Sequence, residues 1–180
     1  MADDRARLLE LIEQHALKRG RFILSSGRES HFYLDGRMVA LHPEGAYLIG
    51  KLIFEQIKGM NVQAVGGLTM GADPVASAVS IVSFLEGQPM DAFLVRKEAK
   101  GHGTKKQVEG PLAPGSRVVI VEDTVTTGES PLKAVAAVKE LDCEVAAVVV
   151  VIDRSEGARE RVEGEGIKFM PLFTVKDLGL

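Results

Sequence analysis

Two adjacent acids near the middle of the chain stand between an apolar run and a turn rich in hydroxyl groups. Glu122 and Asp123 follow the run 118–121, and threonines, a glycine and a serine come directly after them. Adjacent carboxylates can accept hydrogen bonds from two vicinal hydroxyls of a sugar ring. Hydroxyls and a bare backbone at the start of a helix can bind a phosphate. The residues from 118 to 130 therefore predict a site for a phosphorylated ribose.

The position of these acids in the expected fold favours the same interpretation. The run 118–121 is apolar at every position, which is typical of a parallel strand buried on both faces. Ligands of open α/β sheets bind at the carboxyl ends of such strands, where we expect the two acids. A polar loop between an ordinary strand and helix is the alternative. The hydroxyls and the glycine that follow the acids make that alternative the weaker one.

A second polar segment, 96–106, is strongly cationic. It contains five Lys or Arg residues and a histidine with a glycine on either side. A solvated run of charge is the usual explanation of such a segment. Next to a site for a phosphorylated sugar, it could instead be a clamp for a polyphosphate that closes and excludes water. We therefore expect a flexible lid at about 97–110.

The composition limits the class of protein. A length of 180 residues suits a single domain, 1–180, with its own core. The single Cys143 cannot form an internal disulfide, and the N-terminus lacks the apolar core of a signal peptide. We expect a cytoplasmic protein that does not associate with membranes. A net charge of −3 argues against a nucleic-acid partner, because nonspecific binding of that kind relies on a broad positive surface.

The apolar pattern predicts strands that alternate with helices. We expect helices at 3–19, 43–58, 73–85, 131–141 and 158–163, and strands at 22–24, 31–34, 62–65, 92–95, 118–121, 145–152 and 169–175. In this prediction Gly20 ends the first helix, and Asp73 caps the third. Alternation at this spacing implies an α/β fold, with a central parallel sheet that is flanked by helices on both faces.

The segment 118–130 resembles the signature of the type I phosphoribosyltransferases, which bind 5-phosphoribosyl 1-diphosphate (PRPP). The string Arg-Lys-Glu-Ala-Lys-Gly-His-Gly at 96–103 resembles the catalytic loop of the orotate phosphoribosyltransferases, a branch of that family. The resemblance implies transfer of ribose 5-phosphate from PRPP to orotate, in pyrimidine (UMP) biosynthesis. It also implies the type I phosphoribosyltransferase fold, Mg²⁺ held through substrate and water, and a homodimer whose subunits share active sites.

The resemblance also assigns roles to individual residues. It implies catalytic roles for Lys100, Arg96 and His102, and orotate contacts at Thr126 and Arg154. The residues that it implies for PRPP binding are Arg96, Lys97, Lys100, His102, Glu122, Asp123, Thr124, Val125, Thr126, Thr127, Gly128, Glu129 and Ser130.

Two further segments resemble parts of the family. The segment at about 20–36 resembles a small N-terminal hood that covers the base, and 66–73 resembles the loop that binds the diphosphate. The small residues of that loop let backbone amides approach an anion. Two positions depart from the pattern, because Gly71 and Ser25 stand where many members have lysines.

Other functions remain possible on this fold. A phosphoribosyltransferase for another base, such as a purine, would share the signature but not the loop 96–103. A noncatalytic regulator that binds nucleotides and RNA would need a basic surface, whereas this chain is acidic and concentrates its cations at 96–106. A P-loop nucleotide-binding protein is excluded, because the chain has no Gly-x-x-x-x-Gly-Lys-Ser/Thr string.

Overall fold

The computed structural model describes residues 2–23, 29–98 and 107–180. Its helical elements are α1 (Ala2–Leu11), η1 (Ile12–Ala16), α2 (Arg37–Ala40), α3 (Pro43–Ile57), α4 (Ala72–Leu85), α5 (Glu129–Lys139), α6 (Ala158–Gly164) and η2 (Val175–Leu178). Its strands are β1 (Leu17–Ile23), β2 (Glu29–Leu34), β3 (Ala64–Leu68), β4 (Asp91–Val95), β5 (Val108–Glu109), β6 (Arg117–Val125), β7 (Glu144–Asp153) and β8 (Lys168–Thr174).

The described part of the chain forms a six-stranded sheet in the order β5-β4-β3-β6-β7-β8. All neighbouring strands are parallel except β5, which runs antiparallel to β4. The chain moves from β3 outward to β4, and then returns to the other side of β3 to form β6. The gap between the ends of β3 and β6 is therefore the point where the strand order reverses, the usual ligand site of such sheets. The predicted α/β fold with a central, mainly parallel sheet is confirmed.

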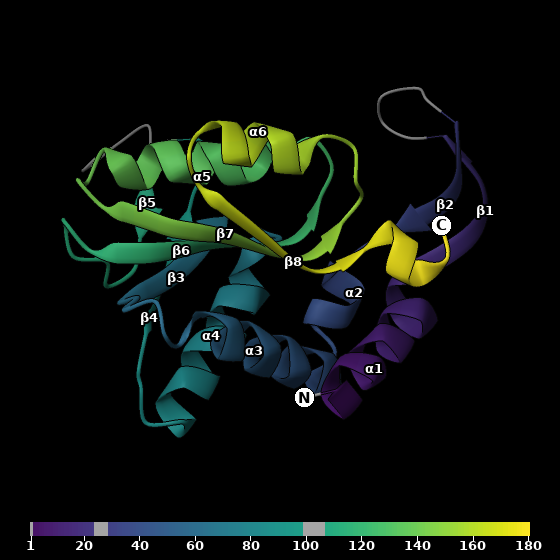
Figure 1. Cartoon of the computed structure of the whole chain (residues 1–180), viewed down its shortest axis with the longest axis horizontal. Coiled ribbons are helices and arrows are strands. Elements are labelled where there is room, and N and C mark those ends of the chain that lie inside the picture. The colour runs from purple at the N-terminus through teal and green to yellow at the C-terminus, as the bar shows by residue number, and fades with distance from the viewer. Residues whose placement is uncertain (1, 24–28, 99–106) are drawn as a thin grey trace.

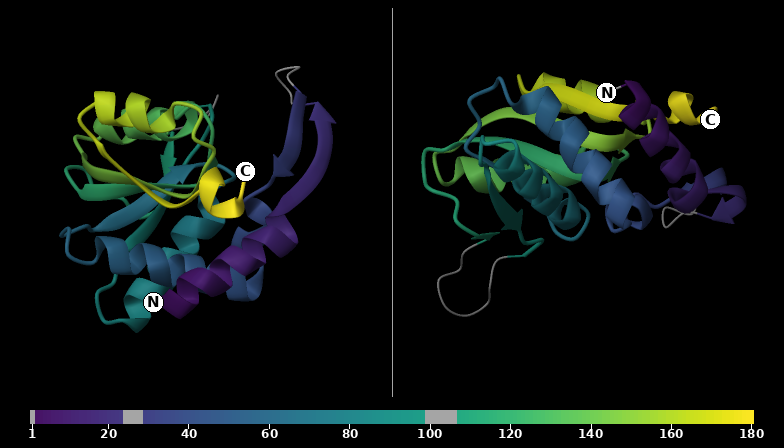
Figure 2. Two further views of the ribbon diagram at one scale, coloured as in Figure 1. Left: turned by 45° about the vertical axis from the view of Figure 1, so that its right-hand side comes forward. Right: turned by 90° about the horizontal axis from the view of Figure 1, so that it is seen from below.

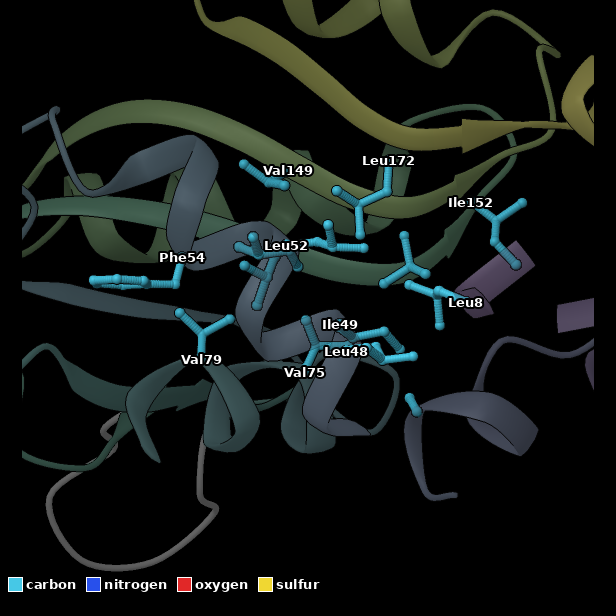
Figure 3. Close-up of a cluster of buried hydrophobic side chains, with 14 of the residues drawn as sticks. Leu8, Leu48, Ile49, Leu52, Phe54, Val75, Val79, Val149, Ile152 and Leu172 are labelled. Atoms are coloured by element: carbon cyan, nitrogen blue, oxygen red, sulfur yellow. The ribbon is translucent and has the colours of Figure 1, made fainter. Parts of the chain in front are cut away.

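Helices cover both faces of this sheet. In Figure 1, α5 and α6 lie above the sheet and α3 and α4 lie below it. Residues of β6 alternate between the two layers, as the pleat of a strand requires. Val119 and Val121 pack in the cluster with α3 and α4, and Val118 and Ile120 pack in the cluster with α5 and α6. Figure 3 shows the first cluster, where side chains from α3 and α4 meet those of β7 and β8.

The N-terminal region differs from the prediction. Helix α1 ends at Leu11, a π-helical turn follows, and strand β1 already begins at Leu17. The predicted helix 3–19 is therefore too long, because Leu17 pairs with Leu34 of β2. Gly20 does not end a helix but lies in β1, at the register irregularity of the β1–β2 hairpin. Figure 2 shows this hairpin standing away from the sheet, next to α1.

The glycines of β3 explain a second difference. The strand predicted at 62–65 begins and ends later, at Ala64–Leu68, and includes Gly66 and Gly67. A Cβ on Gly66 would come 2.2 Å from the carbonyl oxygen of Phe93, and one on Gly67 would come 2.2 Å from that of Val121. These glycines thus allow the neighbouring backbones to approach closely within the strand. The predicted strand ended before them because glycines usually indicate a turn.

Smaller differences concern helix ends and short elements. The N-cap of α4 is Gly71, which makes no side-chain cap hydrogen bond, so the predicted capping role of Asp73 is wrong. The remaining helices and strands lie within a few residues of the predicted ranges. The short elements α2, β5 and η2 were not predicted. None of the described helices has the length and apolar character needed to cross a membrane.

Candidate active site

Strand β6 carries the two acids to the point where the strand order reverses. It pairs with β3 only as far as Ile120, but it pairs with β7 as far as Val125. Glu122 and Asp123 therefore lie within β6, not after its end, because β7 extends the strand beyond the last pair with β3. Both acids are buried, with exposed fractions of 4% and 8%. They therefore lie at the bottom of a crevice, and not in the solvated polar loop that was the alternative interpretation.

The crevice contains a pocket of about 230 Å³. Its walls come from β6, from the turn between β3 and α4, from α2, from the residues after β4 and from the start of α5. The lining residues are Arg37, Leu68, Thr69, Met70, Gly71, Lys97, Glu122, Asp123, Thr124 and Ser130. Segments that are distant in sequence therefore meet around the carboxylates.

Two glycines approach the acids from different elements. A Cβ on Gly71 would come 2.3 Å from Oε1 of Glu122 and 2.3 Å from Oδ1 of Asp123. A Cβ on Gly36 would come 2.4 Å from Oγ1 of Thr124 and 2.8 Å from Oδ2 of Asp123. Neither position can hold a larger residue without movement of the acids or of the backbone. In this chain, the close contact with the acids therefore explains why position 71 is a glycine where many members of the family have a lysine.

Burial dominates the electrostatics of the acid pair. The pKa of Glu122 is raised well above its ordinary value by burial, and further by the charge of Asp123. Burial also raises the pKa of Asp123, against the opposing effects of its neighbours Glu122, Thr124 and Arg37. Within the described ranges, the buried oxygens Oδ1 of Asp73 and Oγ1 of Thr124 have no hydrogen-bond partner. The pocket therefore combines two acids whose charged forms are disfavoured by burial with the hydroxyl of Thr124, which a ligand could satisfy.

The residues after the acids lead into helix α5. Gly128 is the N-cap of α5 and has φ +81°, the left-handed region that favours glycine. Thr126 is half-buried and Thr127 is exposed. Glu129 forms an ion pair with Lys133 at 2.7 Å, so its carboxylate is engaged along the helix. The free N–H groups of the first turn and the nearby hydroxyls make this segment suitable for a phosphate.

Arg154 follows β7 and reaches the hairpin. Its backbone N–H donates to the carbonyl oxygen of Val125 at 3.0 Å, which holds it beside the end of β6. Its Nε donates to Glu156 at 3.0 Å, and its guanidinium lies 4.9 Å from the ring centre of Phe32 in β2. Only 9% of the side chain is exposed. Arg154 is thus held rigidly between the sheet and the hairpin.

Two of the four lid residues assigned from the sequence lie in the described ranges. Lys97 lines the carboxylate pocket. Arg96 lies in an adjoining pocket of about 410 Å³ together with Thr69 and Met70, and its Nη1 is 3.6 Å from a carboxylate oxygen of Glu109. The structure therefore brings Lys97, but not Arg96, to the acid pair. Lys100 and His102 lie outside the described residues, as do the rest of the loop 99–106 and Ser25.

Sequence reasoning missed Arg37 as part of this site, whereas Gly36 and Thr69 were included only as members of the longer segments 20–36 and 66–73. Arg37 lines the pocket, although it lies in a short helix that no periodicity predicted. The available signal was the string Asp-Gly-Arg directly after β2, where two charged residues flank a glycine.

Comparisons with known proteins agree with this geometry. The family model of the phosphoribosyl transferase domain matches residues 38–169. An orotate phosphoribosyltransferase of Aquifex aeolicus is 49% identical over 178 residues, which cover 97% of each chain.

Solved structures show the same relationship. A crystal structure of the Mycobacterium tuberculosis H37Rv orotate phosphoribosyltransferase in complex with Fe(III) dicitrate superposes with a TM-score of 0.89 at 46% identity, and covers 98% of this chain and 99% of that one. A structure of the enzyme from the same organism in complex with PRPP has a TM-score of 0.84 at 44% identity, with the same coverage. With its acid pair at the reversal point of a type I phosphoribosyltransferase fold, the chain belongs to the phosphoribosyl transferase domain family and, within it, to the orotate phosphoribosyltransferases.

Proposed function

We propose that the chain transfers the ribose 5-phosphate of PRPP to N1 of orotate, and releases orotidine 5′-monophosphate and pyrophosphate, in pyrimidine biosynthesis. The observation that carries this proposal is the buried pair Glu122–Asp123 between the turn 69–71 and the start of α5. Acids for a sugar ring thus lie between two segments that can each receive a phosphate group.

Each part of PRPP has a complementary part of the pocket. The carboxylates of Glu122 and Asp123 accept hydrogen bonds from the ribose hydroxyls. The segment Thr124–Ser130 binds the 5′-phosphate through its backbone N–H groups and hydroxyls at the N-terminus of α5. The diphosphate extends toward the turn 69–71. Orotate lies near Thr126 and Arg154, where the guanidinium can pair with its carboxylate.

The reaction needs no nucleophile from the protein. The bond between C1′ and the diphosphate oxygen breaks, and its electron pair leaves with pyrophosphate. Positive charge develops on the ribose as in glycoside hydrolysis, and the nearby carboxylates stabilise it. N1 of orotate forms the new bond to C1′, and its proton passes to solvent, so the step balances without a dedicated base from the protein. Catalysis then comes from positioning and from neutralisation of the leaving group.

The lid residues assigned from the sequence would act on that leaving group. We assign Lys100, Arg96 and His102 to the departing diphosphate, where Lys100 and Arg96 neutralise charge and His102 donates a hydrogen bond or a proton. Such contacts act mainly in the transition state. Lys100→Ala should therefore lower kcat far more than it weakens PRPP binding. Equal losses in both quantities would count against this assignment.

Magnesium fits the chemistry of the pocket. The pKa values of Glu122 and Asp123 are raised by burial, so a cation that arrives with the diphosphate would favour their ionised forms. Within the described ranges, no group of three or more His, Cys, Asp or Glu residues could hold a metal ion. Mg²⁺ commonly keeps substrate and water ligands, and we propose that it does so here. When bound, it would neutralise diphosphate charge.

We further propose a cytoplasmic homodimer with shared active sites. Helix α4 begins beside the pocket and exposes three large apolar residues, Ile81, Phe84 and Leu85, at 62%, 72% and 70%. An apolar face of this kind is suited to a second copy of the chain. Phe84→Glu should convert the dimer to a monomer in sedimentation experiments. A wild-type monomer would contradict the proposal.

Shared sites can be tested by mixing two inactive variants. A Lys100→Ala subunit and an Asp123→Asn subunit should together form hybrid dimers in which one site is intact. Recovery of activity on mixing would support shared sites. No recovery, under conditions where subunits demonstrably exchange, would indicate that each subunit holds a complete site.

The reaction itself is tested by the loss of orotate's ultraviolet absorbance on addition of PRPP and Mg²⁺. Adenine, hypoxanthine and uracil serve as parallel substrates. We expect orotate to be the only base that is consumed. We also expect this activity to disappear when the metal is chelated. Consumption of another base would overturn the orotate assignment but keep the PRPP site. No reaction with any base, while PRPP still binds, would favour a noncatalytic regulator.

A further inference from the structure

The segment Asp35–Arg37 connects the β1–β2 hairpin to the candidate active site. Asp35 accepts hydrogen bonds from Nε and Nη2 of Arg37, each at 2.9 Å, and from its backbone N–H at 3.2 Å. The backbone N–H of Asp35 donates in turn to the carbonyl oxygen of Ala16 at 3.0 Å. Because two hydrogen bonds join the planar guanidinium of Arg37 to the planar carboxylate of Asp35, the guanidinium has a fixed orientation.

The residue between them presses on the pocket floor. Gly36 lies so close to Asp123 and Thr124 that a Cβ there would come within 3 Å of a side-chain oxygen of each. The backbone that carries Arg37 is therefore held against the acid pair. Arg37 itself lines the pocket together with the turn 69–71. Its charge lowers the pKa of Asp123, which opposes the effect of burial.

The distribution of charge indicates what this arginine faces. Among the described residues that line the pocket, Arg37 and Lys97 are the cations. The start of α5 already provides hydroxyls and backbone N–H groups for the 5′-phosphate. The turn Thr69–Met70–Gly71 provides no cationic side chain, and Gly71 has no room for one. A cation for the diphosphate end of PRPP therefore comes from another segment, and Arg37 is the described lining cation that lies outside the loop 96–106.

Arg37 has donors available for such a ligand. A guanidinium has five N–H donors, and the pair with Asp35 uses Nε and Nη2. Nη1 makes no hydrogen bond to any residue in the described ranges, and 45% of the side chain is exposed. We propose that Arg37 binds the diphosphate of PRPP and that Asp35 is the positioning residue that aims it, an inference that rests on the proposed function.

The experiment compares Arg37→Gln with a matched control, Arg7→Gln. Arg7 pairs with Glu44 in the same two-point geometry, at 2.7 and 2.9 Å, and has a similar exposed fraction of 42%. It does not line the pocket. Calorimetric titration with pyrophosphate and Mg²⁺ measures binding without turnover. Arg37→Gln should raise Kd by about tenfold or more, as expected for loss of a charge-assisted hydrogen bond, and Arg7→Gln should not change it.

The positioning role of Asp35 needs a measurement whose result would stay the same if Asp35 only stabilised the fold. Asp35→Asn should raise the Kd for pyrophosphate less than Arg37→Gln does, with the melting temperature little changed. The double variant should bind no more weakly than Arg37→Gln alone, because Asp35 acts through Arg37. Additive losses in the double variant would overturn the positioning role.

The outcomes separate this inference from the proposed function. If the wild type consumes orotate while Arg37→Gln binds pyrophosphate as tightly as the wild type, the assignment of Arg37 is wrong and the function stands. If the wild type consumes no orotate, the proposed function is wrong, and the pyrophosphate titration still decides the role of Arg37. An equal loss of affinity in Arg7→Gln would also overturn the assignment, because it would reflect net charge alone.

Discussion

Strand β6 has two halves that are both buried but carry opposite kinds of residue. The first half, Val118–Val121, is fully buried, and it pairs with β7 on one edge and, as far as Ile120, with β3 on the other. The second half, Glu122–Val125, pairs with β7 alone and carries two buried carboxylates. Apolar side chains between two helix layers stabilise the fold. Buried acids cost stability unless a ligand or cation compensates them. Within one strand, the first half thus contributes to stability and the second half carries the candidate site.

The largest effect should come from the acid floor. Asp123→Asn removes a carboxylate that we place on the ribose hydroxyls, so kcat/KM should fall by roughly a hundredfold to a thousandfold, the range typical of a lost transition-state contact. The free energy of unfolding should stay level or rise, because a buried charge is removed. Steady-state kinetics and urea unfolding measure the two quantities. A loss of stability without a loss of activity would break the comparison between the halves.

The next largest effect should come from the glycine that contacts the acids. Gly71→Ala places a Cβ 2.3 Å from both carboxylate groups, so we expect a drop in kcat/KM of roughly tenfold or more and a destabilisation of about 1–3 kcal/mol. The control is Gly59→Ala, where a Cβ meets nothing within 4 Å. Similar kinetics for both variants would show that the contact at position 71 is easily relieved.

The dependence of stability on pH should distinguish Glu122 from its apolar neighbours. Its pKa in the folded protein is raised well above 4.5, so the folded state keeps a proton that the unfolded state releases. Stability therefore falls as pH rises from about 4.5 through the folded-state pKa. Glu122→Gln cannot titrate. Its free energy of unfolding should exceed that of the wild type at about pH 8, and the difference should shrink toward about pH 5. A difference that does not change with pH would contradict this account.

The smallest effect should come from the first half of β6. Ile120→Val removes one methylene from a fully buried side chain, which should cost about 1 kcal/mol of unfolding free energy. Kinetic constants should stay at wild-type values, because Ile120 points into the layer of α5 and α6. Urea unfolding at one pH, together with the orotate assay, checks both statements. A changed KM for PRPP would mean that packing and binding are coupled along the strand.

The sequence was sufficient to predict the order of the main elements and the region of the sheet that holds the acid pair, but not that β6 continues through the acids to Val125. Both depend on local signals, namely apolar runs, helix periodicity and the acids that directly follow 118–121. The start of β1 at Leu17 could not be predicted, because it depends on pairing with Leu34. Arg37 was missed for a related reason. Its place in the pocket depends on how the hairpin joins the sheet, which no local pattern of residues encodes.

Gly36 and Gly71 also limit how this site can change by mutation. Every single substitution at either position adds a Cβ beside the carboxylates or Thr124. A variant that gains a charged side chain there must also shift the backbone or the side chains of the acids or of Thr124. New charge at the diphosphate end is reached more directly by changes at positions that already project into the pocket. Substitutions at the two glycines are thus the least tolerated way to remodel the pocket. We expect tolerated variation at the other residues that line it.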